Sequence, residues 1–202
     1  MSLANAHLYL LFTPELCAGD PWATLAESLA AGVEVVQWRV KHRRDDDALA
    51  RAMELCRDHG VPLIVNDDVA LAAEVDAAGA HVGHDDMRCS EARELLGPDR
   101  WLGVSTHDLE QIRAAEAAGA DYLGFGPCHP TATKGYDTGQ TDEAIADAMA
   151  AATLPVFAIG GITADNVPRL RALGVTRIAV CAAILGAEKP GDATARLREG
   201  LR

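Results

Sequence analysis

Short apolar segments rich in Val, Ile and Leu alternate along the chain with Ala-rich segments whose apolar residues recur at helical spacing. This alternation is typical of parallel β-strands joined by helices. Eight apolar segments predict strands over residues 8–13, 33–39, 62–66, 79–83, 101–105, 120–126, 154–160 and 175–181. We expect helices to fill the intervals.

The predicted helices have recognisable ends. A glycine follows several of them, at the position where a left-handed residue commonly ends a helix; these are Gly32, Gly60, Gly79, Gly119 and Gly174. At helix starts, side-chain oxygens are expected to cap free backbone N–H groups. Candidate caps lie in residues 45–47, in residues 106–108, and at Thr163 or Asp165 before the seventh helix.

The number of units indicates the fold class. The chain has 202 residues, so each unit takes about 25 residues, which fits the short end of a (β/α)₈ TIM barrel with parallel strands. The alternative is an open doubly wound sheet, which should have a glycine-rich phosphate turn after its first strand. Residues 12–15, Phe-Thr-Pro-Glu, follow instead. The sequence therefore favours a single barrel domain over residues 1–202.

Composition and charge restrict the partners. Hydrophobic residues make up 49% and charged residues 24% of the chain, as in ordinary globular proteins. The net charge of −12 argues against binding to nucleic acid or to anionic membranes. No apolar run approaches the roughly 18 residues of a membrane span. We expect a cytoplasmic protein that meets any anionic ligand in a local cationic pocket, and its oligomeric state stays open.

The five cysteines are widely scattered and include no Cys-x-x-Cys pair. A disulfide framework or a structural zinc site is therefore not expected. Cys128 and Cys181 fall at the ends of predicted strands, where each could be a reactive thiol or a small buried apolar residue. We expect the second role.

Polar residues after the strands are the candidates for chemistry, because a barrel builds its active site at the carboxyl ends of its strands. Gln37, Arg39 and Lys41 alternate near the end of the second strand, which places them on one side. Each can hold a phosphate oxygen. They could instead be solvated residues of an exposed strand. The positions of the lysines favour a phosphate-binding role. The chain has three lysines, and two of them, Lys41 and Lys134, fall in predicted loops at the active face of the barrel.

Carboxylates follow the next two strands. The third strand leads into Asn66, Asp67 and Asp68, and the fourth into residues 84–86, His-Asp-Asp. Mg²⁺ is commonly held by one or two carboxylates together with phosphate oxygens. Some of these residues could merely cap the following helices. We assign Asp67 and Asp86 to the metal and Asp68 to a cap.

Three further loops complete the predicted rim. Ser105 is expected to hydrogen-bond a phosphate, because no Gly-x-Ser-x-Gly elbow supports a nucleophile and His107 is more typical of a helix start. The longest loop, residues 126–139, contains Thr131, Thr133 and Lys134 and is interpreted as a substrate lid. Residues 160–163, Gly-Gly-Ile-Thr, lead into a predicted helix and offer backbone amides to a second phosphate. The rim thus predicts two anion sites, one of them assisted by a metal.

The order and spacing of these motifs resemble the thiamine-phosphate synthase family. The resemblance rests on VQWRVK at 36–41, VNDD at 65–68, HVGHDD at 81–86, GVSTH at 103–107, GPCHPTATK at 126–134 and AIGGIT at 158–163. It implies a (β/α)₈ barrel that joins hydroxymethylpyrimidine diphosphate to hydroxyethylthiazole phosphate. The products would be thiamine phosphate and pyrophosphate, and the cofactor Mg²⁺. The family chemistry is dissociative, so that the C–O bond to the diphosphate breaks before the thiazole nitrogen captures the pyrimidine methylene cation.

The resemblance also implies roles for individual residues. Diphosphate binding would fall to Gln37, Arg39, Lys41, Asn66, Ser105 and Lys134, magnesium binding to Asp67 and Asp86, and thiazole phosphate binding to Thr131, Thr133 and Gly161. Arg39, Lys41, Ser105 and Lys134 would be catalytic. At residues 181–183, Cys-Ala-Ala replaces a segment in which a serine is common in the family.

Two alternatives stay open. A thiazole tautomerase has a similar barrel but uses an acid/base histidine, and it has no need of Asn66, Asp67 and Asp86 as a magnesium set. A barrel that senses phosphate without catalysis is the other. Lys41, Lys134 and the two metal carboxylates argue against it, because binding alone does not require all of them.

Overall fold

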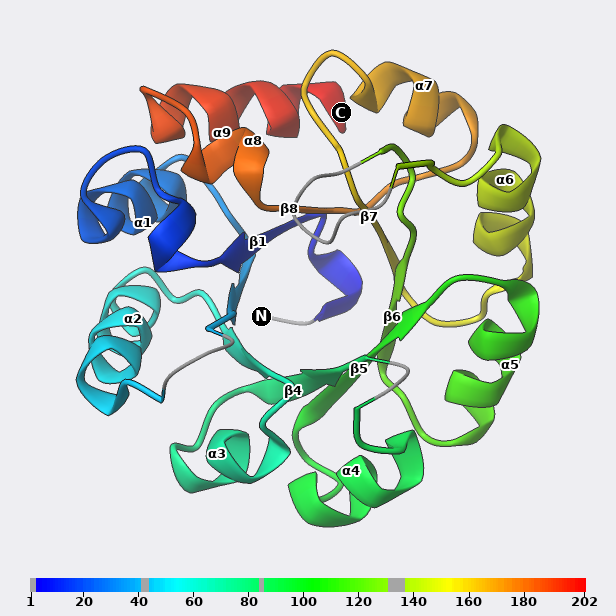
Figure 1. The fold of residues 1–202 in the computed structure, drawn as a ribbon, viewed down its shortest axis with the longest axis horizontal. Helices are drawn as coiled ribbons and strands as arrows, with labels where there is room; N and C mark the ends of the chain where they lie inside the picture. The colour runs from blue at the N-terminus through cyan, green and yellow to red at the C-terminus, as the bar shows by residue number, and fades with distance from the viewer. Residues whose placement is uncertain (1–2, 41–43, 84–85, 131–136) are drawn as a thin grey trace.

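The computed structural model describes residues 3–40, 44–83, 86–130 and 137–202. Eight parallel strands close into a barrel in chain order, from β1 to β8 and back to β1, and helices surround the barrel (Figure 1). The closing pair aligns Leu8 of β1 with Ile178 of β8. The (β/α)₈ prediction is confirmed, and the open-sheet alternative is wrong.

Every predicted strand is present, although most are shorter than the apolar runs that predicted them. The strands are β1 (Leu8–Phe12), β2 (Val35–Trp38), β3 (Leu63–Asn66), β4 (Gly79–Val82), β5 (Trp101–Thr106), β6 (Tyr122–Phe125), β7 (Val156–Ile159) and β8 (Ile178–Val180). The α-helices are α1 (Pro21–Ala30), α2 (Asp46–Asp58), α3 (Val69–Glu74), α4 (Cys89–Leu96), α5 (Leu109–Ala117), α6 (Asp142–Ala151), α7 (Val167–Ala172), α8 (Ala182–Leu185) and α9 (Pro190–Gly200). Two 3₁₀ turns, η1 (Leu3–Asn5) and η2 (Pro14–Leu16), flank β1. None of the described helices is long and apolar enough to cross a bilayer.

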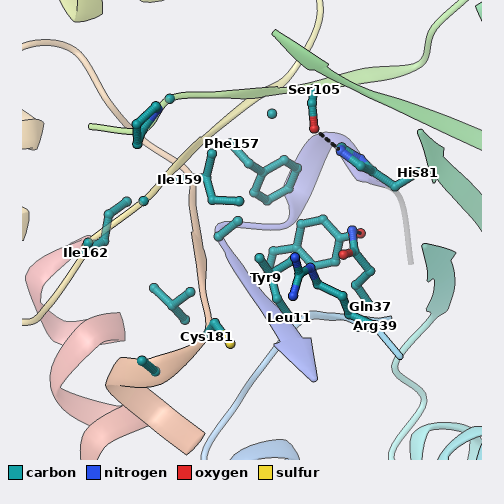
Figure 2. A pocket seen from close by; sticks show the side chains of 18 of the residues that line it. Tyr9, Leu11, Gln37, Arg39, His81, Ser105, Phe157, Ile159, Ile162 and Cys181 are labelled. Atoms are coloured by element: carbon teal, nitrogen blue, oxygen red, sulfur yellow. Dashed lines mark hydrogen bonds between the residues drawn. The ribbon is translucent and has the colours of Figure 1, made fainter. Parts of the chain in front are cut away.

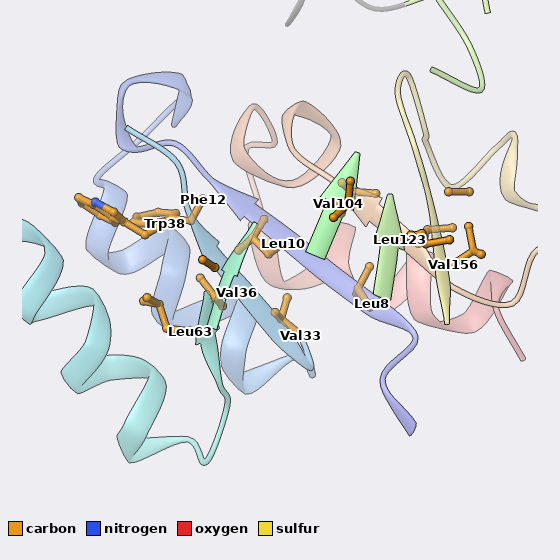
Figure 3. Packing of buried hydrophobic residues seen from close by; sticks show 14 of the residues in the cluster. Leu8, Leu10, Phe12, Val33, Val36, Trp38, Leu63, Val104, Leu123 and Val156 are labelled. Carbon is orange, nitrogen blue, oxygen red and sulfur yellow. The ribbon is translucent and has the colours of Figure 1, made fainter. Parts of the chain in front are cut away.

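Side chains on alternate positions of each strand point to opposite sides of the barrel wall. Along β1, Leu8, Leu10 and Phe12 face outward and are fully buried in a large core between strands and helices (Figure 3). Val36 and Trp38 of β2 belong to the same outer core. Each such side chain contributes about 1.5–3 kcal/mol by leaving water. The outer core therefore holds the helices to the barrel.

The intervening positions fill the barrel interior. Tyr9 and Leu11 of β1 belong to a smaller inner cluster with Tyr122 and Phe157. Near the amino end of the chain, Leu3 of η1 joins this cluster, and Figure 1 shows η1 inside the ring of strands. The inner cluster is the layer beneath the carboxyl-end cavity described below.

Most predicted helix ends are correct. Asp45, Asp68 and Asp108 cap α2, α3 and α5, each carboxylate accepting a hydrogen bond from the backbone N–H three residues later. Gly32, Gly60, Gly119 and Gly174 have φ between 66° and 102°, as expected of glycines that end helices.

Two helix-end predictions are wrong. Gly79 does not end a helix but opens β4, where an added Cβ would lie 2.0 Å from the Trp101 carbonyl oxygen. The left-handed residue after α3 is instead Asp76, with φ of 55°. Thr163 and Asp165 do not cap α7, which begins at Val167 with Asn166 as its N-cap residue. The Asn166 side chain turns back to accept a hydrogen bond from the Thr163 N–H (2.9 Å).

Candidate active site

A cavity of about 390 Å³ opens at the carboxyl ends of the strands (Figure 2). It is lined by inward-facing strand residues and by the loops that follow β5, β6, β7 and β8. Five of the predicted site residues line it, and they are Gln37, Arg39, Asn66, Ser105 and Gly161. Asp67 and Asp86 lie on neighbouring loops but do not line this cavity. Lys41, Thr131, Thr133, Lys134 and the rest of residues 131–136 of the predicted lid fall outside the described residues.

Arg39 is the cationic centre of the cavity. It is 7% exposed, and while its backbone N–H donates to the Phe12 carbonyl (2.9 Å), its guanidinium makes no hydrogen bond or ion pair with any residue that the structure describes. Within the described part of the chain, no Asp or Glu lines the cavity. A buried guanidinium without a carboxylate partner carries a large desolvation penalty unless a ligand supplies the negative charge. The arrangement therefore suits an anionic ligand in a protein whose net charge is −12.

The predicted metal residues sit on the loops after β3 and β4. Asp67 is half-buried, adopts a left-handed φ of 64°, and donates its N–H to the His81 carbonyl (2.8 Å). Asp86 is exposed, and its Oδ2 accepts a hydrogen bond from the Gly83 N–H (2.8 Å). Among the described residues, no group of three or more His, Cys, Asp or Glu is arranged to hold a metal ion. Two carboxylates nevertheless fit Mg²⁺, which takes one or two from a protein when phosphate oxygens and water fill its other positions.

Gly83 positions the Asp86 carboxylate. An added Cβ at Gly83 would lie 2.4 Å from Asp86 Oδ2. The obstructing atom ends an exposed, flexible side chain, so we expect Gly83→Ala to change the free energy of unfolding by less than about 0.5 kcal/mol. The carboxylate must move, so with Asp86 in its predicted role as a metal residue, Mg²⁺ should bind several-fold more weakly to the variant. A magnesium titration of the two proteins measures this. An unchanged magnesium affinity would show that Asp86 needs no support from Gly83.

A chain of hydrogen bonds crosses the wall of the cavity below Ser105. Ser105 Oγ lies 3.0 Å from His81 Nε2, and His81 Nδ1 lies 3.2 Å from Tyr122 Oη. Tyr122 Oη is 3.0 Å from Tyr9 Oη, which accepts a hydrogen bond from Gln37 Nε2 (2.9 Å). Tyr9, His81 and Tyr122 are not among the residues predicted for the site from the sequence. His107, which follows Ser105 at the same rim, places Nδ1 2.5 Å from the Gly126 carbonyl oxygen.

The two glycines after β7 let two loops approach closely. An added Cβ at Gly160 would lie 2.5 Å from Pro127 Cβ, and one at Gly161 would lie 2.5 Å from the Pro130 carbonyl oxygen. Both glycines also adopt positive φ, of 97° and 61°. The expectation that they lead straight into a helix is wrong, because α7 begins at Val167. Gly161 still lines the cavity, as the predicted phosphate contact requires.

The cysteines near the cavity are not activated thiols. Burial raises the pKa of Cys128 to about 11 and raises the pKa of Cys181, which lines the cavity. Both thiols therefore stay protonated at neutral pH. Cys128 is 1% exposed and packs in the outer core, which agrees with its expected apolar role.

Fold and site together define a (β/α)₈ barrel protein with a cationic cavity at the carboxyl ends of its strands. The sequence model for the family described as "Thiamine monophosphate synthase" matches residues 8–184. The chain belongs to this family, and the resemblance drawn from the motifs is confirmed.

Two similar relatives carry the name thiamine-phosphate synthase. The one from Prochlorococcus marinus (strain MIT 9313) is 43% identical over 99% of this chain. The one from Geobacillus kaustophilus (strain HTA426) is 44% identical over 88% of this chain and 84% of its own length. The chain spans 50–58% of the length of the cyanobacterial relatives it matches.

Solved structures agree with the family assignment. The thiamine phosphate pyrophosphorylase from Pyrococcus furiosus superposes with a TM-score of 0.86 at 32% identity, covering 96% of this chain and 95% of its own. A 3-hexulose-6-phosphate synthase superposes with a TM-score of 0.70 at 17% identity, covering 97% of this chain and all of its own, which shows the shared fold alone.

Proposed function

We propose that this protein is a thiamine-phosphate synthase that joins hydroxymethylpyrimidine diphosphate to hydroxyethylthiazole phosphate and releases pyrophosphate. The observation that carries the proposal is the buried side chain of Arg39, which lines the cavity. Its guanidinium has no carboxylate partner among the described residues. A diphosphate supplies the missing negative charge. The names of the relatives at 43–44% identity support the same activity.

The reaction we propose begins with departure of the diphosphate. The C–O bond breaks, its electron pair leaves with the diphosphate, and the ring nitrogen of the thiazole then donates its electron pair to the methylene cation. Arg39 holds the departing anion through charge-assisted hydrogen bonds, and Ser105 donates its hydroxyl to the same group. The cavity offers no ionised thiol among its described residues, which favours this route over attack by a protein nucleophile.

The aromatic side chains of the inner cluster give the cavity an apolar floor. The Tyr9, Tyr122 and Phe157 rings pack edge to face, with centroids 5.3–5.9 Å apart. Such a surface excludes water that would otherwise capture the cation. It leaves the thiazole nitrogen as the nucleophile that is held in place.

Asp67 and Asp86 would hold magnesium, which when bound neutralises part of the negative charge of the diphosphate. We propose that Asn66 binds the diphosphate beside them and that Gln37 orients it. Lys41 and Lys134 are proposed as further diphosphate and catalytic residues, and Thr131, Thr133 and Gly161 as contacts of the thiazole phosphate.

Incubation of the protein with both precursors, with and without Mg²⁺, tests the proposal. We expect thiamine phosphate and pyrophosphate to form in equal amounts, and only when Mg²⁺ is present. Conversion of a thiazole isomer without the pyrimidine diphosphate would favour the tautomerase instead. Binding of both precursors without any product would favour a barrel that senses phosphate.

A further inference from the structure

The hydrogen-bonded chain under the cavity links five side chains from five strands or strand ends. It runs from Gln37 through Tyr9, Tyr122 and His81 to Ser105, with each link between 2.9 and 3.2 Å. Gln37 and Tyr9 are each 2% exposed and Tyr122 is fully buried. Figure 2 shows Ser105 and His81 joined at the cavity wall, with Gln37 beside Tyr9 on the neighbouring strands. Both ends of this chain, Gln37 and Ser105, line the cavity and belong to the predicted diphosphate site.

The hydroxyl hydrogen of Tyr9 determines which group donates and which accepts in each hydrogen bond of the chain. Gln37 donates Nε2–H to Tyr9 Oη, so the Tyr9 hydroxyl hydrogen needs another acceptor. Among the described residues, the remaining partner of Tyr9 Oη is Tyr122 Oη. A buried hydroxyl that donates to nothing is strongly disfavoured. Tyr9 therefore donates to Tyr122.

The same reasoning passes along the next two links. Tyr122 accepts from Tyr9, so its own hydrogen points to His81 Nδ1. Burial raises the pKa of both tyrosines, so each keeps its proton. With Nδ1 as an acceptor, neutral His81 carries its hydrogen on Nε2 and donates it to Ser105 Oγ.

Gly103 leaves the space that this chain needs. It lies on β5 next to the strands that carry His81 and Tyr122. A Cβ at Gly103 would lie 2.1 Å from Tyr122 Cζ and 2.4 Å from His81 Nδ1. Any larger residue would therefore separate the two rings at their hydrogen bond.

We propose that His81 is a positioning residue, held in the Nε2–H tautomer by Tyr122, that turns the Ser105 hydroxyl hydrogen toward the diphosphate. Ser105 already accepts from His81, so its own hydrogen is available to the anion in the cavity. This inference rests on the proposed function. The opposite direction would make His81 an acceptor from Ser105, as in an enzyme that activates a serine nucleophile.

The tautomer of His81 tests the proposal directly. The full chain labelled with ¹⁵N-histidine is studied without substrate by long-range ¹H–¹⁵N NMR, and the His81 signals are those missing from His81→Gln. We expect a single Nε2–H tautomer. In Tyr122→Phe, Nδ1 loses its donor and we expect both tautomers. A Nδ1–H tautomer in the unaltered protein, or an unchanged tautomer in Tyr122→Phe, would overturn the proposal.

Turnover gives a second measurement with a conservative rescue. His81→Leu and Tyr122→Phe should each lower kcat by about tenfold, as expected from loss of one charge-assisted hydrogen bond. His81→Gln keeps an N–H donor of similar reach and should retain kcat within about threefold. Equal losses in His81→Gln and His81→Leu would show that the histidine has only a packing role.

Ile64→Val is the matched control. Ile64 is fully buried in the same inner cluster but does not line the cavity and carries no polar atom. The variant should leave both the tautomer and kcat unchanged, and a changed tautomer would attribute the effect to packing. The tautomer is read without substrate, so an Nε2–H signal in a protein that forms no thiamine phosphate would reject the proposed function and leave the hydrogen-bond direction standing.

Discussion

Replacing Arg39 by methionine is expected to lower kcat/KM for the pyrimidine diphosphate by at least about 100-fold. A guanidinium can form two charge-assisted hydrogen bonds to a phosphate, each contributing about 1.5–3 kcal/mol. The same change should leave the free energy of unfolding equal or higher. Arg39 is 7% exposed and its guanidinium has no partner among the described residues. Removing such a cation relieves the protein of its desolvation penalty.

Steady-state kinetics and urea denaturation measure the two effects. Arg113→Met on α5 is the matched control, because Arg113 is exposed and lies away from the cavity. It makes the same change in net charge and should alter neither quantity. A fall in stability of Arg39→Met that matches its loss of activity would instead make Arg39 a structural residue.

Asp67→Asn should reduce magnesium-dependent turnover by about 1,000-fold or more, since a bound metal supplies several kcal/mol of charge stabilisation in such reactions. The fold should be retained. Asp67 has a φ of 64°, and asparagine adopts this left-handed conformation as readily as aspartate. Asp86→Asn is expected to have the same effect on turnover. Turnover over a range of Mg²⁺ concentrations measures the loss.

The neighbouring carboxylate offers an internal control. Asp68 accepts a hydrogen bond from the Leu71 N–H (2.8 Å) and caps α3. Asp68→Ala should lower the free energy of unfolding by about 1 kcal/mol and leave the magnesium dependence unchanged. Near-normal turnover in Asp67→Asn, or lost magnesium dependence in Asp68→Ala, would contradict the division of roles between these two residues.

The fold could be predicted from the sequence because it depends on a repeated pattern rather than on any one residue. The outward positions of the strands, such as Leu8, Leu10 and Phe12, face helices and must be apolar. The inward positions of the same strand, Tyr9 and Leu11, are also apolar or aromatic because the interior is closed. Continuous apolar runs are typical of strands buried on both faces.

Local backbone choices were harder to predict. Gly79 follows two alanines, as do Gly32 and Gly119, but it is needed where β4 passes the Trp101 carbonyl. Asp76 takes the left-handed position instead and pairs with Arg100 (2.7 Å). Such contacts between distant residues are absent from a local pattern. The same holds for Asn166, whose side chain turns back to Thr163.

The site was predicted at the strand ends and missed inside the strands. Gln37, Arg39, Asn66 and Ser105 follow from their place at the carboxyl ends. His81 lies within β4, and a residue inside a predicted strand is assigned to the buried core rather than to the site. One signal could have identified it, because His81 is the polar residue on the inward side of β4, opposite Gly103 on β5. Because Gly103 has no side chain, it leaves space at this level of the barrel for the His81 ring.

The separation of the two cores has a consequence for how such a protein can change. Outward side chains carry most of the apolar burial that keeps the helices in place, whereas the cavity is lined mainly by inward side chains and loops. Substitutions that alter what the barrel binds can therefore accumulate on one side of its wall with little penalty on the other. A lineage could exchange its chemistry while its scaffold, and its tolerance to heat, stay nearly constant.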